Sequence, residues 1–262
     1  MSAGWYHSCA LYAGGTVRCW GDNGGRQQDL PPATTYALVA SGRARSCAGR
    51  VSGSVVCWGI KAAGVVPSGL PPAIALSVGG FHTCILAANR LPVCWGLDDS
   101  GQLDIPARAV AVESLSAGYG HTCAIVGDHS VVCWGNNDFG QSDPPANLTG
   151  AKVVSAGYRH TCVATIAHTA ACWGSNSLGQ SAIPPGLPPI DDISAGYGHT
   201  CALTTTSYVI CWGLNQTGQI DAPGELRFKK VAAGFYHTCG VTADNRIYCW
   251  GDNSYGQSAP PQ

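Results

Sequence analysis

The sequence is poor in charge. Only 11% of its 262 residues are Asp, Glu, Lys or Arg, the formal net charge is −1, and no run of basic residues occurs. Proteins that bind nucleic acid or anionic lipid surfaces usually carry a positively charged patch. We therefore expect neither a nucleic-acid partner nor attachment to a membrane surface.

Long apolar runs and helical patterns are also missing. No apolar run approaches the roughly 20 residues of a membrane-spanning helix, so we expect no direct membrane insertion. No segment has a helical periodicity long enough to predict a helix. No nucleophile motif, phosphate-binding loop or carboxylate pair stands out, so we expect no enzymatic activity, no cofactor and no metal.

A secretory leader is absent as well. Met1, the one methionine, stands directly before Ser2-Ala3-Gly4, which are the first residues of a repeat described below. We interpret the chain as a mature or trimmed domain, in which case the missing leader says little about the native compartment.

Cysteine, by contrast, is abundant and regular. The 14 cysteines fall into seven pairs of constant spacing, and the first members of successive pairs are 37 to 39 residues apart. The pairs are Cys9 and Cys19, Cys47 and Cys57, Cys84 and Cys94, Cys123 and Cys133, Cys162 and Cys172, Cys201 and Cys211, and Cys239 and Cys249. A period of this length indicates a solenoid or a propeller. We predict one domain, 1–262, with repeats at about 1–37, 38–75, 76–112, 113–151, 152–190, 191–229 and 230–262.

Each repeat has the same internal order, which the fourth shows best. An apolar segment ends at Gly118, His121-Thr122-Cys123 begins an alternating run, and a polar turn leads to a second run that ends in Cys133-Trp134-Gly135. Two β-rich runs around a short polar connection predict a hairpin. An Asn- and Asp-rich turn then closes on Gly140-Gln141, and prolines follow in most repeats.

A repeat of this length suits one propeller blade of four strands of about five residues. An open solenoid would need atypical capping units, whereas the first and last repeats here are ordinary copies. We therefore predict an all-β, seven-bladed β-propeller. Its least regular part should be the second repeat, where Arg43-Ala44-Arg45 replaces the usual aromatic and histidine, and 60–64 lacks the Asn and Gln.

The paired cysteines can be interpreted in three ways. Residues n and n+10 lie opposite each other across the predicted hairpin, which suits one disulfide per blade. Buried free thiols are one alternative. A zinc site formed by His121, Cys123 and Cys133 is another, although the spacing is unfamiliar and Arg45 interrupts the set. We expect disulfides, with the repeated histidines as hydrogen-bonded structural residues and the Trp of each Cys-Trp-Gly packed between blades.

The unit Ser-Ala-Gly-x-x-His-Thr-Cys-Ala-Leu…Val-x-Cys-Trp-Gly-x-Asn-x-x-Gly-Gln resembles the repeat of the regulator of chromosome condensation family over essentially the whole chain. The resemblance implies a seven-bladed β-propeller. The units are shorter than in the nuclear exchange factor that names the family, and its repeat lacks both cysteines, which argues against a nuclear or GTPase-exchange role. The short unit is more similar to the secreted bacterial β-lactamase inhibitor of this family, and Cys-Trp-Gly to the extracellular propeller of Crinkly-type plant receptor kinases. Both relatives bind partners, and neither propeller is an enzyme.

The two residues between the repeated glycine and the repeated histidine vary from repeat to repeat, whereas the glycine and, outside the second repeat, the histidine are constant. In a closed ring these loops emerge on one face, and Tyr, Trp and Arg are enriched at binding hot spots. In the β-lactamase inhibitor relative, similar loops form the binding face. We therefore predict partner contacts at Trp5, Tyr6, Arg43, Phe81, Tyr119, Tyr158, Arg159, Tyr197, Phe235 and Tyr236. The alternative is that these aromatics only plug the central channel.

We predict an extracellular, non-catalytic binding module for a protein or peptide partner. Persistent disulfides are typical of oxidising compartments, and Asn147 and Asn215 head glycosylation sequons. One alternative is a self-associating structural subunit of an extracellular fibre or coat. Another is a lectin that binds glycans through repeated aromatic pockets.

Overall fold

The computed structural model describes residues 1–31, 35–60 and 65–261. The predicted irregularity at 60–64 therefore lies, apart from Ile60, outside the described residues, as does Gln262. The strands form seven separate antiparallel sheets of three strands each, in chain order. These sheets are the seven blades of a β-propeller, as the repeats predicted.

The blades are numbered along the chain. Blades 1 to 3 contain β1 (Ser2–Ala3), β2 (His7–Leu11) and β3 (Val17–Gly21); β4 (Tyr36–Ser41), β5 (Arg45–Arg50) and β6 (Val55–Gly59); and β7 (Ala73–Val78), β8 (His82–Ala87) and β9 (Pro92–Gly96). Blades 4 and 5 contain β10 (Ser114–Ala117), β11 (His121–Ile125) and β12 (Val131–Gly135); and β13 (Ala151–Ala156), β14 (His160–Thr165) and β15 (Ala170–Gly174). Blades 6 and 7 contain β16 (Ile190–Ala195), β17 (His199–Thr204) and β18 (Val209–Gly213); and β19 (Phe228–Ala233), β20 (His237–Thr242) and β21 (Ile247–Gly251). A short 3-10 helix, η1 (Ala13–Gly15), lies in the first hairpin.

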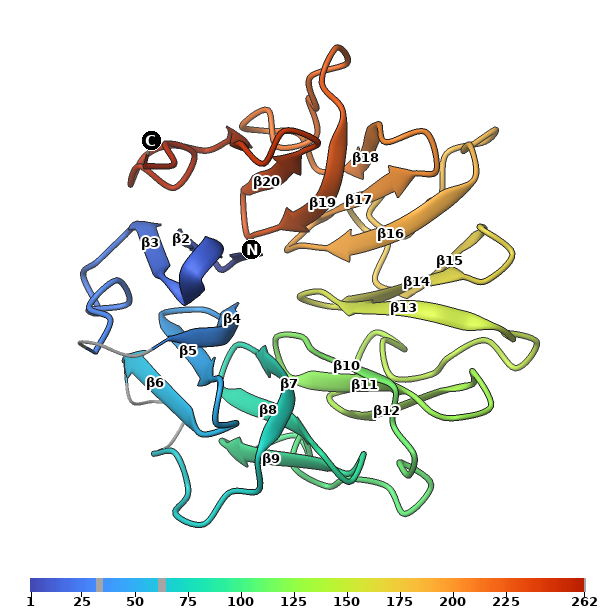
Figure 1. The fold of residues 1–262 in the computed structure, drawn as a ribbon. Coiled ribbons are helices and arrows are strands. Elements are labelled where there is room, and N and C mark those ends of the chain that lie inside the picture. The colour runs from blue at the N-terminus through green and yellow to red at the C-terminus, as the bar shows by residue number, and fades with distance from the viewer. Residues whose placement is uncertain (32–34, 61–64, 262) are drawn as a thin grey trace.

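The blades follow one another around a common centre, and blade 7 returns beside blade 1 (Figure 1). Backbone hydrogen bonds join neighbouring blades around this centre. At six of the seven interfaces of the described residues, the residue after the repeated glycine donates its N–H to the glycine carbonyl of the next blade, and the interface of blades 2 and 3 is the exception. The bond from Tyr119 to Gly157 is 3.0 Å long. The bond from Phe235 to Gly4, at 3.2 Å, joins the last blade to the first. The ring is therefore closed.

The expectation of four strands per blade was wrong. In the described residues each sheet has three, because the segment after Trp-Gly folds as a turn instead of pairing. In the fourth repeat the buried Gln141 side chain accepts a hydrogen bond from the Phe139 N–H at 2.9 Å and also donates to Asn136. The Gln side chain thus takes the hydrogen-bonding place of a partner strand, and Pro144-Pro145 after it removes N–H donors that a ladder would need.

All seven predicted disulfides are present. Each joins the middle and outer strands of one blade at directly paired positions, such as Cys123 and Cys133. The Cα atoms are 4.0–4.1 Å apart, just below the usual disulfide range of about 4.4–6.8 Å. With the thiols oxidised and His121 Nε2 at 2.8 Å from Thr161 Oγ1, the atoms of the alternative zinc site are already engaged.

A repeated set of four residues holds neighbouring blades together, and we call it the interblade clasp. Between blades 4 and 5, the Gln141 carbonyl accepts hydrogen bonds from Thr161 Oγ1 and Trp173 Nε1, both at 2.9 Å. Because the Thr161 hydroxyl proton is used there, His121 must donate from Nε2 to Thr161. The histidines and tryptophans are thus structural, as predicted.

The clasp also closes the ring. Blade 7 and blade 1 are joined by His237 Nε2 to Ser8 Oγ at 2.7 Å and by Trp20 Nε1 to the Gln257 carbonyl at 2.9 Å. The clasp is incomplete between blades 6 and 7, where the Trp250 indole has no hydrogen-bond partner among the described residues. It also differs at the interface of blades 2 and 3, where Arg45 stands in place of the histidine. There the buried Thr83 hydroxyl has no hydrogen-bond partner among the described residues.

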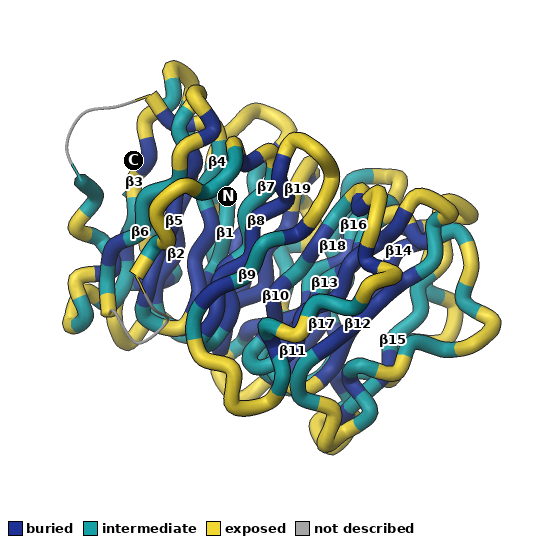
Figure 2. Tube along the Cα trace, turned by 90° about the horizontal axis from the view of Figure 1, so that it is seen from below, coloured by how far each residue is buried: buried dark blue, intermediate teal, exposed yellow. Residues whose placement is uncertain are grey.

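The core is divided among the interfaces of the ring. Buried residues follow the strands, and exposed residues gather in the connecting loops (Figure 2). The cluster around Trp134, for example, combines Leu86 and Cys84 of blade 3 with Leu115 and Val132 of blade 4. Each blade therefore depends on its neighbour for a core, as expected for a repeat of this size.

The glycine at the inner end of each first strand permits this close approach. A Cβ at Gly118 would lie 2.4 Å from the Gly157 carbonyl oxygen and 2.6 Å from His121 Cε1. We expect Gly118→Ala to lower the free energy of unfolding by about 2–4 kcal/mol, because it combines overpacking with loss of the Tyr119–Gly157 bond. Urea unfolding followed by tryptophan fluorescence measures this.

Gly224→Ala is the matched control. Nothing lies within 4 Å of a Cβ at Gly224, and its φ is not in the left-handed region. This variant should be neutral or slightly stabilising. A Gly118→Ala protein within about 0.5 kcal/mol of the wild type, the size of an ordinary surface substitution, would show that the glycine is not required for blade contact.

Candidate binding face

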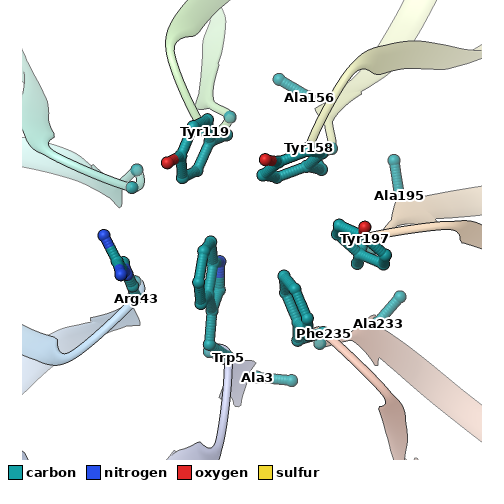
Figure 3. A pocket seen from close by; sticks show the side chains of 18 of the residues that line it. Ala3, Trp5, Arg43, Tyr119, Ala156, Tyr158, Ala195, Tyr197, Ala233 and Phe235 are labelled. Carbon is teal, nitrogen blue, oxygen red and sulfur yellow. The ribbon is translucent and has the colours of Figure 1, made fainter. Parts of the chain in front are cut away.

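The Gly-x-x-His loops form one face around the central channel, which we call the mouth face. The first variable residues lie nearest the channel, and the side chains of Trp5, Tyr119, Tyr158, Tyr197 and Phe235 gather over its centre (Figure 3). These inner residues are Trp5, Arg43, Gly80, Tyr119, Tyr158, Tyr197 and Phe235. Six of the seven loops are held in place by a backbone hydrogen bond from the N–H of the inner residue to the glycine carbonyl of the next blade, so these residues project from a rigid ring.

The inner aromatics contact one another. Ring centroids are 4.2 Å apart for Trp5 and Phe235, 4.0 Å for Phe235 and Tyr197, and 4.7 Å for Tyr197 and Tyr158. Only a cavity of about 100 Å³ remains at the channel mouth. These rings therefore fill the mouth and also form a floor on the outer surface, since all except the buried Phe235 remain half-exposed.

The second variable residues form an outer circle. Tyr6, Phe81 and Tyr236 are half-exposed, and Arg159 is exposed. Tyr6 lies 5.5 Å and Tyr236 4.6 Å from the Phe235 ring. Thus all ten predicted contact residues lie on the mouth face. Burial raises the pKa of the Tyr6, Tyr119 and Tyr236 hydroxyls, which keeps them uncharged at neutral pH.

Residues of the Gly-Gln turns extend this face, and they were absent from the predicted set. Tyr255, which is 55% exposed, lies 5.3 Å from the Tyr6 ring, and Phe139, which is 42% exposed, lies under the Arg159 guanidinium at 4.5 Å. Leu178 occupies the equivalent position in blade 5. The sequence pattern could have predicted these residues as part of the face. Their position varies from repeat to repeat within a constant Asn-x-x-Gly-Gln motif, just as the loop residues vary within the Gly-x-x-His motif.

Two arginines lie on the mouth face, each against two rings. Arg43 is 4.7 Å from the Trp5 centroid and 4.9 Å from the Phe81 centroid. Arg159 is 4.5 Å from Phe139 and 4.9 Å from Tyr158. Ring faces attract a guanidinium and orient its plane, which leaves its N–H groups directed past the rings.

The two sequon asparagines differ in environment. Both are exposed. The Asn215 amide donates to Asp221 Oδ1 at 2.8 Å, and its oxygen accepts the Ile220 N–H at 3.2 Å, so a glycan there would disturb the turn. The prediction of glycosylation at Asn147 and Asn215 stays a prediction.

No group of His, Cys, Asp and Glu side chains within the described ranges could hold a metal ion. The described part of the chain also contains no helix long and apolar enough to cross a membrane. The mouth face combines aromatic rings, hydroxyls and guanidinium groups with the carboxylates of Asp22, Asp99 and Asp138.

Solved structures of similar shape include two receptor ectodomains. The ectodomain of the Physcomitrella patens receptor kinase CR4 has a TM-score of 0.80 and 24% identity, over 94% of this chain and 69% of that one. The Crinkly WD40 ectodomain of the Arabidopsis thaliana receptor kinase ACR4 has a TM-score of 0.78 and 26% identity, over 97% and 93%. Prp20p from Saccharomyces cerevisiae has a TM-score of 0.77 and 17% identity, over 89% and 80%.

No curated protein matches the chain significantly in sequence. The sequence profile described as the regulator of chromosome condensation (RCC1) repeat matches residues 1–27, 112–141, 152–180, 190–219 and 228–257. These segments cover more than half of the chain, in five of its seven repeats, and the ring they form agrees with the structural neighbours. The chain therefore belongs to the regulator of chromosome condensation (RCC1) repeat family.

Proposed function

We propose that residues 1–262 form a single extracellular domain that binds a protein or peptide partner through the mouth face and performs no catalysis. The observation that carries this proposal is the gathering of half-exposed aromatics and two arginines on one side of a rigid ring. Rigid aromatic and arginine side chains supply most of the energy at protein interfaces and lose little conformational entropy on binding.

The compartment and the relatives support the same proposal. Seven disulfides suit an oxidising environment, and two similar structures are receptor ectodomains. Prp20p, a ring of the same fold, is characterised by its binding to Gsp1p and histones. A lectin with repeated equivalent pockets is less favoured, because the pockets on the mouth face differ in their lining residues from blade to blade.

Selection from a displayed library of random peptides tests the proposal. The immobilised oxidised domain should enrich peptides whose affinity falls at least about tenfold in a Tyr6→Ala/Tyr236→Ala variant, because truncating interface tyrosines removes hot-spot contacts. Isothermal titration of one enriched peptide measures the change and should give one peptide per ring.

Ile166→Ser is the control. Ile166 is 51% exposed at the hairpin end of blade 5, opposite the mouth face, so its replacement removes an apolar side chain without touching the loops. Enriched peptides that lose affinity with Ile166→Ser and keep it with the tyrosine variant would place binding elsewhere. Several equivalents of one sugar bound per ring would instead favour the lectin.

A further inference from the structure

The mouth face loses its seven-fold regularity at blade 2. The residue after Arg43 is Ala44, and blades 4 and 6 also have a small residue at this position, Gly120 and Gly198. Among the seven loops, only the small residue of blade 2 is followed by an inner position without a side chain, Gly80 of blade 3. The Tyr119 ring occupies the space beside Gly80, where a Cβ would lie 2.6 Å from Tyr119 Cδ2. A pocket of about 370 Å³ remains beside Arg43 and Ala44. Its walls include Trp5, Tyr6 and Phe81.

Arg43 lines this pocket, and its guanidinium forms no ion pair with the described residues. Its guanidinium lies between the Trp5 and Phe81 rings at 4.7 and 4.9 Å. Those ring contacts are its interactions, and it makes no hydrogen bond or ion pair with any residue that the structure describes. A guanidinium held by its faces presents N–H donors at its edge, and two of them match the two oxygens of a carboxylate.

The local charge favours an anion. Arg45, which is 6% exposed, also lines the pocket. The one carboxylate in the lining, Asp22, already accepts hydrogen bonds from the Gly24 N–H at 2.8 Å and from Gln27 Nε2 at 2.6 Å. The two arginine side chains therefore outnumber the one carboxylate, which keeps its negative charge in these hydrogen bonds.

The second arginine of the mouth face gives a useful comparison. Arg159 lies between two rings in the same way, but its pocket of about 310 Å³ is also lined by Asp99 and Asp138. These carboxylates supply negative charge beside Arg159 and disfavour an acidic ligand there. The distinction between the two pockets comes from charge, because their volumes and aromatic walls are alike.

We propose that the Arg43 pocket binds an acidic side chain of a peptide partner, with the carboxylate on the Arg43 guanidinium and a neighbouring apolar side chain against Trp5 and Phe81. This inference rests on the proposed function and names the chemistry of its partner. The volume lies at the lower end of the range for ligand pockets, which suits one or two side chains. Because a small outer residue meets an inner glycine at one place among the seven loops, the loops provide one site of this kind.

Titration with two dipeptides tests the proposal by ¹H–¹⁵N NMR of the oxidised chain. Acetyl-Phe-Glu-amide should shift the indole N–H signal of Trp5, and acetyl-Phe-Gln-amide, which has the same shape without the charge, should bind at least about tenfold more weakly. The Trp134 indole, which donates to the Gln102 carbonyl at 3.0 Å inside the ring, is the internal reference.

Variants locate the contact. Arg43→Gln should weaken the Glu dipeptide at least about tenfold and bring it level with the Gln dipeptide. Ala44→Leu should block both dipeptides by filling the pocket while leaving Arg43 in place. Arg108→Gln removes an equal charge from an exposed position outside both pockets and should change neither affinity.

Three results would overturn the inference. The first is equal affinity for the two dipeptides, and the second is no shift of the Trp5 indole signal at about 20 mM dipeptide, twentyfold above a Kd of about 1 mM. The third is a loss of affinity with Arg159→Gln equal to that with Arg43→Gln. None of these results tests the proposed function. That function is tested by the library-selected peptides and by their loss of affinity in the Tyr6→Ala/Tyr236→Ala variant. Dispersed NMR signals of each variant confirm that it is folded.

Discussion

Acidification from pH 7 to pH 5 should unfold this protein. Burial lowers the pKa of His7, His82 and His199 to about 4, and of His121, His160 and His237 to about 3, from the usual 6.5. Each ring is fully buried between blades, where its Nδ1 atom has no hydrogen-bond partner among the described residues. The imidazolium form therefore has no favourable place in the folded state.

The sign of the effect follows from proton uptake. Below pH 6.5 the unfolded chain binds protons at these histidines and the folded chain does not, so stability is full above pH 6.5 and falls as the pH drops toward 4. Each histidine lowers the free energy of unfolding by about 1.4 kcal/mol per pH unit. Six acting together remove about 8 kcal/mol per unit, comparable to the whole stability of a typical domain.

Urea unfolding between pH 7.5 and 4.5 measures the effect. The slope of the logarithm of the unfolding constant against pH should correspond to about six protons, and to about five in His160→Gln, whose amide can still donate to Thr200. Stability that stays constant between pH 7 and 5 would contradict the assignment of neutral, buried histidines.

Reduction of the disulfides should have the second large effect. Each bridge closes a loop of sequence separation 10, and such a loop restricts the unfolded chain by about 3 kcal/mol in the chain-entropy model. The contributions of the seven bridges do not simply add, because neighbouring blades share a core. Even a partial sum should lower the thermal unfolding midpoint by at least about 15 °C.

The matched experiment removes one bridge. Cys162→Ala/Cys172→Ala should lower the midpoint by about 5–10 °C, and calorimetry with and without a phosphine reductant compares it with full reduction. Alkylation followed by mass spectrometry counts the thiols in each sample. Natively isolated protein that is alkylated at all 14 cysteines would contradict both the bridges and the extracellular assignment.

The repeat made much of this fold predictable. A constant spacing of Cys123 and Cys133, seen in every unit, determines a hairpin register, and seven complete units without capping sequences imply a closed ring. The inward and outward residues of the loops could be placed on one face for the same reason. Periodicity carries this information because every copy must satisfy the same neighbours.

What the sequence did not predict depends on contacts between units. The turn that ends at Gln141 has the length of a strand, and only its hydrogen bonds show that the glutamine amide replaces strand pairing. The pocket at Arg43 is lined by two small residues of neighbouring blades, Ala44 and Gly80, although the Tyr119 ring occupies the space beside Gly80. A missing side chain leaves a cavity only when nothing else moves in, and that outcome requires coordinates.

The closed ring has a mechanical consequence for blade 2. In an open stack the end units fray first, but here no unit is terminal, so any one blade can loosen only by separating from both neighbours at once. Blade 2 keeps its His7–Ser46 link to blade 1 and has lost the histidine link to blade 3. The blade that offers the pocket therefore also lacks the repeated histidine contact to the next blade. A ligand that contacts Trp5, Arg43 and Phe81 would connect blades 1, 2 and 3.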